Sequence, residues 1–296
     1  MTEAKPGVLY IVGTPIGNLE DMTFRGVRIL QSVDFIAAED TRHTGKLLKH
    51  FQVNTPQISY HEHNRNSRVP ELLTRLSEGK DIALVNDAGV PGISDPGYEL
   101  VKACAENGIT VVPIPGPVAA ITALSASGIS TDKFVFEGFL SSKAKQRRSH
   151  LELLKLEERT LVFYESPHRL RSTLQDMREI FGDDRQIVLA RELTKIYEEF
   201  WRGDIAGACS YYETKAPIGE HTLVVAGHYP SQQEYTQDEL IEKLETIMNR
   251  GISPSQASRQ LAALTSLPRR QLYQLALNLK NLDCEMQDTK IVNLEN

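Results

Sequence analysis

The sequence predicts an α/β protein with two α/β lobes and a small helical domain at its C-terminal end. Short apolar runs rich in β-branched residues recur along the chain, and segments with helical spacing follow them. Alternation of this kind favours largely parallel sheets in the first half of the chain. The length of 296 residues fits two domains and a small third one, at roughly 100–200 residues per domain.

The expected elements follow this alternation in chain order. Glu71–Ser77 and Tyr98–Glu106 have the spacing of helices that lie between strands. After the last strand the pattern is helical, and Ser253 followed by Pro254 is typical of an N-cap and a first helical residue. The runs expected as buried strands are Val8–Val12, Phe35–Ala38, Ile82–Asn86, Thr110–Ile114, Thr160–Tyr164, Ile187–Ala190 and Thr222–Ala226. The helices expected in the last domain are Asp238–Arg250, Ser255–Ala263 and Arg269–Leu279.

Turn-rich segments mark the expected domain boundaries. Ala126–Lys133 separates the two lobes, and Gly227–Ser231 follows the last strand. We therefore expect a first lobe over residues 1–128, a second lobe over 129–228, a helical domain over 229–282 and a polar, mobile tail over 283–296.

Composition limits the classes of function. The net charge of −6 disfavours a bulk coat for nucleic acid, although local basic patches matter more than the sum. The three cysteines lie far apart without a C-x-x-C pair, which fits a reducing cytoplasm and argues against a zinc site. No secretory signal is visible, and no apolar run reaches the roughly 18 residues that a membrane helix needs. We expect a cytoplasmic protein without a membrane partner.

The stretch LVNDAGVPGISDPG, Leu84–Gly97, leads from the end of a strand to the start of a helix. Asp95 precedes Pro96 and is expected to cap that helix, in preference to a direct ligand contact. Asp87 comes earlier, where the strand ends, among glycines that let a ligand approach the backbone. The local pattern leaves a ligand contact and an Asx-turn equally open for Asp87.

Other strand ends carry similar turns, and together they predict one cleft. Val12 is followed by GTPIGN, Ala38 by EDTR and Ile114 by PGPVAA. The first turn lacks the full G-x-G-x-x-G of a dinucleotide site, and a phosphate-binding P-loop is absent. A nucleoside without a polyphosphate suits these loops better, because carboxylates bind ribose hydroxyls or an ammonium group and backbone amides bind an adenine edge.

An ordered set of motifs resembles one enzyme family. The set is GTPIGNLED, AAEDTRHTGKLL, DAGVPGISDPG, PGPVAAITALSASG, FEGFL, FYESPHR, ARELTKIYEE and GEHTLVVAG. In this order the motifs are similar to bacterial small-subunit ribosomal RNA methyltransferases that modify the 2′-hydroxyl of a cytidine in the decoding centre. Those enzymes belong to the tetrapyrrole-methylase-like superfamily and use S-adenosylmethionine. The segment ISPSQASRQLAALTSLPRRQLYQLAL continues the resemblance more loosely.

The resemblance implies that S-adenosylmethionine is held in the cleft between the two lobes. It also makes Asp87 the favoured contact to the cofactor. Val90 and Gly92 stand where the family usually has Thr and Leu, and Asn86 where it has Ser. These departures leave a backbone contact at Val90 but remove a hydroxyl contact. The cofactor-binding residues implied are Gly13, Pro15, Asp87, Gly89, Val90, Ser94, Val118 and Ala119.

Two clusters at strand ends supply candidates for the chemistry. A ribose hydroxyl is a weak acid, so a nearby base, or cations that favour its alkoxide, help the transfer. AEDTR offers Asp40 and Arg42, whose simpler role is a helix cap with an ion pair. YESPHR offers Glu165 and His168, whose simpler role is a plain helix start at Ser166. All four residues are expected as catalytic candidates, and the identity of the base stays open.

The FEGFL motif is expected to be a loop, and the basic segment that follows it, SSKAKQRRSH, is expected to contact RNA phosphates. A solvated helix face is the usual role of such a run, but its position in the resembled family and the acidity of the rest of the chain favour RNA. The expected RNA-binding residues are Lys143, Lys145, Arg147, Arg148 and Arg169. The His61-Glu62-His63 loop has no further ligand at a typical spacing, so no metal is expected.

The predicted function is therefore S-adenosylmethionine-dependent 2′-O-methylation of a cytidine ribose in the decoding region of small-subunit ribosomal RNA. One alternative is a methylase of the same superfamily that acts on a tetrapyrrole or a protein histidine. The other is a non-catalytic ribosome-assembly factor. The resemblance also implies a homodimer, and it implies ribosomal RNA in the assembled subunit as the partner.

Overall fold

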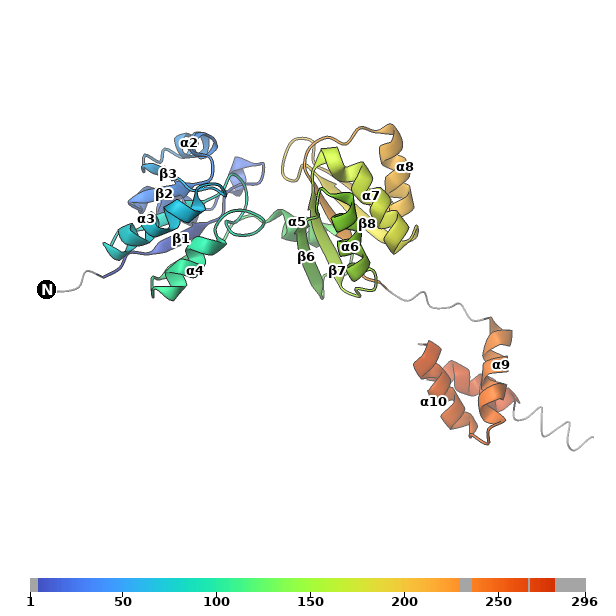
Figure 1. The fold of residues 1–296 in the computed structure, drawn as a ribbon. Helices are drawn as coiled ribbons and strands as arrows, with labels where there is room; N and C mark the ends of the chain where they lie inside the picture. The colour runs from blue at the N-terminus through green and yellow to red at the C-terminus, as the bar shows by residue number, and fades with distance from the viewer. Residues whose placement is uncertain (1–4, 229–235, 266, 280–296) are drawn as a thin grey trace, which may run out of the picture. The chain divides into compact units, whose positions relative to one another are not determined.

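The computed structural model describes residues 5–228, 236–265 and 267–279 (Figure 1). The chain forms two compact units that divide between His228 and Tyr229. The tail predicted to be mobile, 283–296, lies outside the described residues.

The first lobe is a parallel sheet with helices on both faces. Its strand order is β3-β2-β4-β1-β5. Ala83 and Val85 of β4 pack with α1 and α2, and Ile82 and Leu84 pack with α3 and α4. Strands buried on both faces read as continuous apolar runs, which is why these strands were predictable. The strands are β1 Leu9–Val12, β2 Phe35–Ala38, β3 Gln57–Ser59, β4 Ile82–Val85 and β5 Val111–Ile114. The helices are η1 Leu19–Asp21, α1 Phe24–Ser32, α2 Thr41–His50, α3 Arg65–Ser77 and α4 Tyr98–Glu106.

The second lobe is a mixed sheet in the order β6-β7-β10-β8-β9. β6 and β7 are parallel, and the remaining neighbours are antiparallel. One face is covered by α6, α7 and α8, and the other by α5. The strands are β6 Phe134–Phe139, β7 Thr160–Glu165, β8 Gln186–Arg191, β9 Glu199–Asp204 and β10 His221–Val225. The helices are α5 Ala119–Ser127, α6 Ala144–Leu154, α7 Pro167–Phe181 and α8 Ile205–Thr214.

Helix α5 follows the first sheet along the chain but packs on the second. Ala120, Ala123 and Leu124 are buried against strand residues such as Val162 and Val224. The small side chains of α5 let it approach this sheet closely. The chain therefore passes from the first lobe to the second between β5 and α5, before the boundary that was predicted after residue 128.

Three strands were not predicted, each for a local reason. β3 has three residues, too few for a periodic pattern, and the alternation in β9 is short. The FEGFL motif was expected to be a loop, but most of it lies in β6. Gly138 has a φ of 61° there, and the pairing with β7 shifts register between Phe136 and Gly138. A bulge of this kind bends an otherwise regular strand.

The second unit is helical, as predicted. It contains α9 Gln237–Met248, α10 Pro254–Thr265 and a further helical run over 269–279. Thr236 and Glu239 form a capping box at the start of α9. Leu244, Leu261 and Leu272 are buried together in its core. No helix within the described ranges is long and apolar enough to cross a membrane.

Candidate functional site

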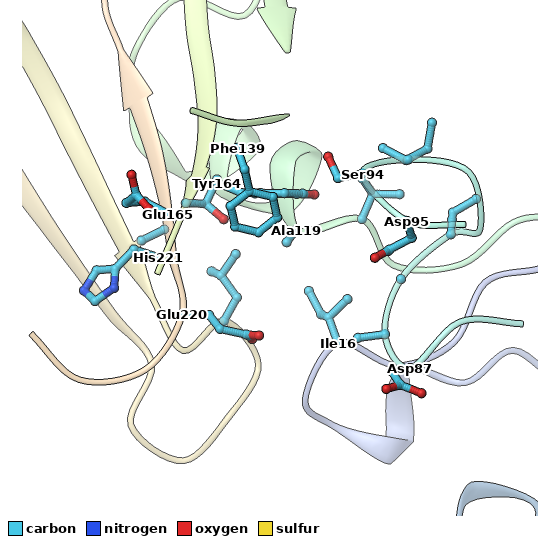
Figure 2. Close-up of a pocket in the computed structure, with 18 of the residues that line it drawn as sticks. Ile16, Asp87, Ser94, Asp95, Ala119, Phe139, Tyr164, Glu165, Glu220 and His221 are labelled. Atoms are coloured by element: carbon cyan, nitrogen blue, oxygen red, sulfur yellow. The ribbon is translucent and has the colours of Figure 1, made fainter. Parts of the chain in front are cut away.

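A pocket of about 360 Å³ lies between the first-lobe loops and the second sheet (Figure 2). Its size is within the roughly 300–1,000 Å³ of small-molecule sites. The first lobe lines it with residues that follow β1, β2 and β4, namely Ile16, Glu39, the run 87–90 and the run 93–95. The second lobe contributes the start of α5, the last residues of β6, β7 and β8, and the first residues of β10. The strand-end turns singled out in the sequence thus meet at one place.

The first-lobe loops are held together by backbone contacts at glycines. The Thr14 amide donates to the Gly89 carbonyl (2.9 Å), and the Gly89 amide donates back (3.1 Å). Gly13 lies so close to Gly116 that a Cβ on Gly13 would be 2.8 Å from the Gly116 Cα. Gly13 and Pro15 are buried behind the pocket wall, whereas Gly89, Val90, Ser94, Val118 and Ala119 line it.

Asp95 does not cap the helix that follows it, contrary to the expectation. Helix α4 begins at Tyr98, and its N-cap is Gly97, which has a φ of 154° and makes no side-chain cap. Because Gly97 is not helical, Pro96 cannot be the first helical residue. Asp95 is thereby freed from the helix and lines the pocket.

Asp87 joins its loop to the loop that follows β2, and it lines the pocket. Its Oδ1 accepts a hydrogen bond from the Asp40 amide (3.3 Å), and its own amide donates to Glu39 Oε2 (3.4 Å). It still lines the pocket. The Asx-turn is therefore not formed among the described residues, because the Asp87 carboxylate accepts from the loop after β2 and not from an amide of its own turn, and the ligand contact stays a prediction.

The pocket has an acidic lining. Glu39, Asp87, Asp95 and Glu220 all line it. Burial, together with the nearby charges of Glu39, Asp87 and Glu220, raises the pKa of Asp95 to about 6. Burial likewise raises the pKa of Glu39. A field of this sign favours a cationic ligand.

The wall from the second lobe is partly aromatic. The Tyr164 hydroxyl accepts a hydrogen bond from the Ala120 amide (3.1 Å) at the start of α5. Phe139 leaves 53% of its surface exposed, its ring lies 5.5 Å from that of Tyr164, and the Arg169 guanidinium is 6.0 Å from it. An exposed ring beside a guanidinium is a surface on which a nucleobase stacks well.

Glu165 is 1% exposed, and protein donors occupy both of its oxygens. Oε1 accepts from the Ser166 amide (2.8 Å) and pairs with Arg169 (2.8 Å), and Oε2 accepts from Thr173 Oγ1 (2.6 Å). This arrangement positions Arg169 at the pocket edge. Each oxygen of Glu165 thus already contacts at least one protein donor.

The other predicted catalytic candidates lie outside the pocket lining. Asp40 caps α2 by accepting from the Arg42 amide (2.8 Å), and it pairs with the 89% exposed Arg42 side chain (2.7 Å). His168 is exposed near the start of α7. The simpler roles that the sequence allowed for these residues match their geometry.

The basic segment divides into exposed and buried members. Lys143 and Lys145 are exposed, and neither ammonium group has an ion-pair partner among the described residues. Arg147 is 5% exposed and paired with Asp176 (2.7 Å). Arg148 pairs with Asp176 (2.8 Å) and with Glu179. Arg147 therefore serves the packing of α6 on α7, because its guanidinium cannot reach a phosphate from this position.

Some pocket residues were missed by the sequence reading. Phe139, Lys195 and Glu220 line the pocket although only their motifs were quoted. They reach it through the pairing of strands distant in the chain, which a local pattern does not reveal. Within the described residues, no three His, Cys, Asp or Glu side chains are grouped so that they could hold a metal ion.

The lining fits the cofactor that the resemblance implies. S-adenosylmethionine carries a cationic sulfonium and an ammonium group, which suit Glu39 and Asp87. Its adenine ring suits the apolar side chains of Ile16 and Val118.

Comparison with known proteins gives two family matches. The model described as Tetrapyrrole (Corrin/Porphyrin) Methylases matches residues 8–209, and the model described as RsmI C-terminal HTH domain matches residues 236–280. The ribosomal RNA small subunit methyltransferase I of Synechocystis sp. is 57% identical over 93% of this chain and 99% of that protein. The protein of the same name from Escherichia coli O157:H7 is 45% identical over 92% of this chain and 95% of its own length.

Solved structures share the fold at low identity. A uroporphyrin-III C-methyltransferase from Thermus thermophilus, complexed with S-adenyl homocysteine, aligns with a TM-score of 0.55 at 14% identity. That alignment covers 74% of this chain and 97% of that one. A diphthine synthase aligns with a TM-score of 0.57 at 13% identity, over 75% of this chain and 90% of that one.

Proposed function

We propose a function from the premise that this chain belongs to the tetrapyrrole (corrin/porphyrin) methylases and, within them, to the ribosomal RNA small subunit methyltransferase I family. The proposed function is methylation of the 2′-hydroxyl of a cytidine ribose in the decoding region of small-subunit ribosomal RNA. Membership confirms the family that the motifs predicted. The observation that carries the proposal is the 57% identity to the Synechocystis sp. protein, over 93% of this chain and 99% of that protein. The aligned region therefore includes both units of the chain.

S-adenosylmethionine supplies an activated methyl group on a sulfonium. Asp87 and Glu39 hold its positive groups, and the backbone from Gly89 to Val90 and the start of α5 hold its nucleoside. The protein's share of the catalysis is to align the acceptor oxygen with the methyl group and to exclude water.

The RNA approaches from the second lobe in this proposal. Lys143 and Lys145 contact phosphates, and Arg169 with Phe139 receives the acceptor nucleotide at the pocket edge. The enzyme acts in the cytoplasm on the assembled subunit, as a homodimer. The helical unit adds further RNA contact.

Transfer of a labelled methyl group tests the acceptor. S-adenosylmethionine is offered with unmodified small subunits, with naked ribosomal RNA and with a tetrapyrrole precursor, and the labelled nucleoside is identified by mass spectrometry. We expect label on a cytidine ribose of the subunit. Label on the tetrapyrrole, or on no RNA at all, contradicts the proposal.

Replacing Asp87 with Ala is expected to weaken S-adenosylmethionine binding by about 10- to 100-fold, because a charged hydrogen-bonding group contributes about 1.5–3 kcal/mol. Calorimetry on the protein without RNA measures this effect. Asp132→Ala is the matched control, since Asp132 is exposed and outside the pocket lining. Equal affinities of the two variants would remove Asp87 from the cofactor site.

Replacing both Lys143 and Lys145 with Gln is expected to weaken RNA binding. The slope of log affinity against log salt should become shallower by about 0.7 for each phosphate that the protein no longer neutralises. S-adenosylmethionine affinity should not change, because neither lysine lines the pocket. Fluorescence anisotropy with a labelled RNA over a salt series gives the slope. An unchanged slope would move the RNA path to another surface.

A further inference from the structure

Asp95 differs from the other carboxylates that line the pocket. Glu165 has protein donors on both oxygens, and Glu220 pairs with Lys195 (3.2 Å). Glu39 accepts from the Asp87 amide. Asp87 accepts from the Asp40 amide. Asp95, in contrast, makes no hydrogen bond or ion pair with any described residue.

Other groups that could take a proton are also engaged. His221 lies 3.0 Å from the Tyr212 hydroxyl through Nε2 and 3.0 Å from the Gly219 carbonyl through Nδ1. Burial lowers the pKa of His221 to about 4. The Tyr164 hydroxyl accepts from α5, and burial raises its pKa. His168 does not line the pocket.

The backbone holds Asp95 where the two lobes meet. The preceding residue, Ser94, has a left-handed backbone conformation with a φ of 61°. A Cβ on Gly138 of β6 would be 3.0 Å from the Ser94 hydroxyl oxygen, so this loop packs against the strand that carries Phe139. Figure 2 shows Asp95 on the first-lobe side, with its carboxylate directed into the pocket.

We propose that Asp95 is the general base that accepts the proton of the ribose 2′-hydroxyl during methyl transfer. The inference rests on the proposed function. As the bond from the ribose oxygen to the methyl carbon forms, the bond from that carbon to sulfur breaks and its electron pair stays on sulfur. The hydroxyl proton moves to a carboxylate oxygen of Asp95, and it exchanges with water afterwards because Asp95 is only half-buried.

The surroundings of Asp95 make it a stronger base than an ordinary aspartate. The charged groups that face it are Glu39 after β2, Asp87 after β4 and Glu220 before β10, with Tyr164 on β7. With a pKa of about 6, Asp95 is ionised at neutral pH and still binds a proton more readily than a free carboxylate. An effective general base has a pKa near the working pH.

The test compares Asp95→Asn with the control Asp132→Asn in single turnovers at saturating S-adenosylmethionine and RNA. Asparagine keeps an oxygen that accepts a hydrogen bond but cannot take the proton. We expect transfer by Asp95→Asn to fall at least about 100-fold, the usual size of general base catalysis, and partial recovery in Asp95→Glu. Transfer by the unsubstituted protein should drop about tenfold per pH unit below the pKa that Asp95 has in the complex with cofactor and RNA, and that dependence should vanish in Asp95→Asn.

Carbon-13 NMR of the aspartate carboxyl groups gives a readout apart from activity. One signal of the free protein should titrate near pH 6 and be absent in Asp95→Asn. Calorimetry with S-adenosylmethionine shows that each variant retains a folded pocket.

The outcomes separate the inference from the proposed function. A rate for Asp95→Asn within about threefold of the control overturns the inference, and so does a pH inflection that persists in Asp95→Asn. If the unsubstituted protein and Asp132→Asn transfer no methyl group to any RNA, the proposed function itself fails and the inference fails with it.

Discussion

Replacing Asp176 with Ala is expected to lower the free energy of unfolding by about 3–5 kcal/mol, because the Arg147 guanidinium would be left buried without its anion. Arg147 and Asp176 have side chains that are 5% and 10% exposed and lie 2.7 Å apart. The pair joins α6 to α7 beneath the exposed lysines. Urea denaturation followed by circular dichroism measures the change.

Glu179→Ala is the matched control on the same helix. Glu179 is itself 45% exposed, and its partners are the partly exposed Arg148 and the Gln175 side chain amide (3.1 Å), so its loss should cost under about 1 kcal/mol. Replacing both partners of the buried pair, Arg147→Met with Asp176→Leu, should recover most of the stability, because no buried guanidinium is then left without an anion. A loss below about 1 kcal/mol for Asp176→Ala would show that the pair is hydrated in solution.

The same pair shows where sequence reasoning reaches its limit. Four basic residues in six positions predicted an RNA-binding surface, and only two of them are exposed and unpaired within the described residues. Asp176, which pairs with the buried Arg147, is 29 positions away in the sequence. It lies on α7, and only the tertiary fold determines how α7 packs against α6. A local charge run therefore predicts an electropositive segment but not which of its members face solvent.

The fold was predictable where the strands are buried on both faces. The strands of the parallel sheet other than β3 agree with the apolar runs to within one residue. β3 and β9 were missed because each is too short or too polar for a periodic signal. β6 was not predicted because it contains the bulge at Gly138, and a glycine inside a strand pattern resembles a turn.

The candidate site was predictable on its first-lobe side only. Its loops follow directly on strands, where ligands bind in open parallel sheets, so these turns could be placed from the pattern. Asp87 and Val118 were singled out by the family resemblance, and both line the pocket. Asp95 could not, because the choice between Pro96 and Tyr98 as the first helical residue depends on the backbone of Gly97. The second wall, with Phe139 and Glu220, depends on how β6 and β10 pair with β7.

Replacing Gly116 with Ala is expected to lower S-adenosylmethionine affinity by at least about tenfold and stability by about 1–3 kcal/mol. A Cβ there would be 2.7 Å from the Gly13 Cα, a backbone atom that cannot rotate away. The two loops must separate, and the Thr14–Gly89 pairing that shapes the pocket shifts with them. The affinity loss follows because the cofactor contacts proposed at Gly89 and Val118 are on these loops.

Gly45→Ala is the control that separates this collision from the general effect of adding a methyl group. Gly45 lies within α2, and a Cβ there would meet only the Gln57 Nε2 at 3.5 Å. Alanine in a helix interior should raise stability by about 0.5–1 kcal/mol and leave cofactor affinity unchanged. Calorimetry and urea denaturation on both variants decide the matter. If Gly116→Ala binds S-adenosylmethionine as tightly as Gly45→Ala does, the close approach of the two loops is not what shapes the cofactor site.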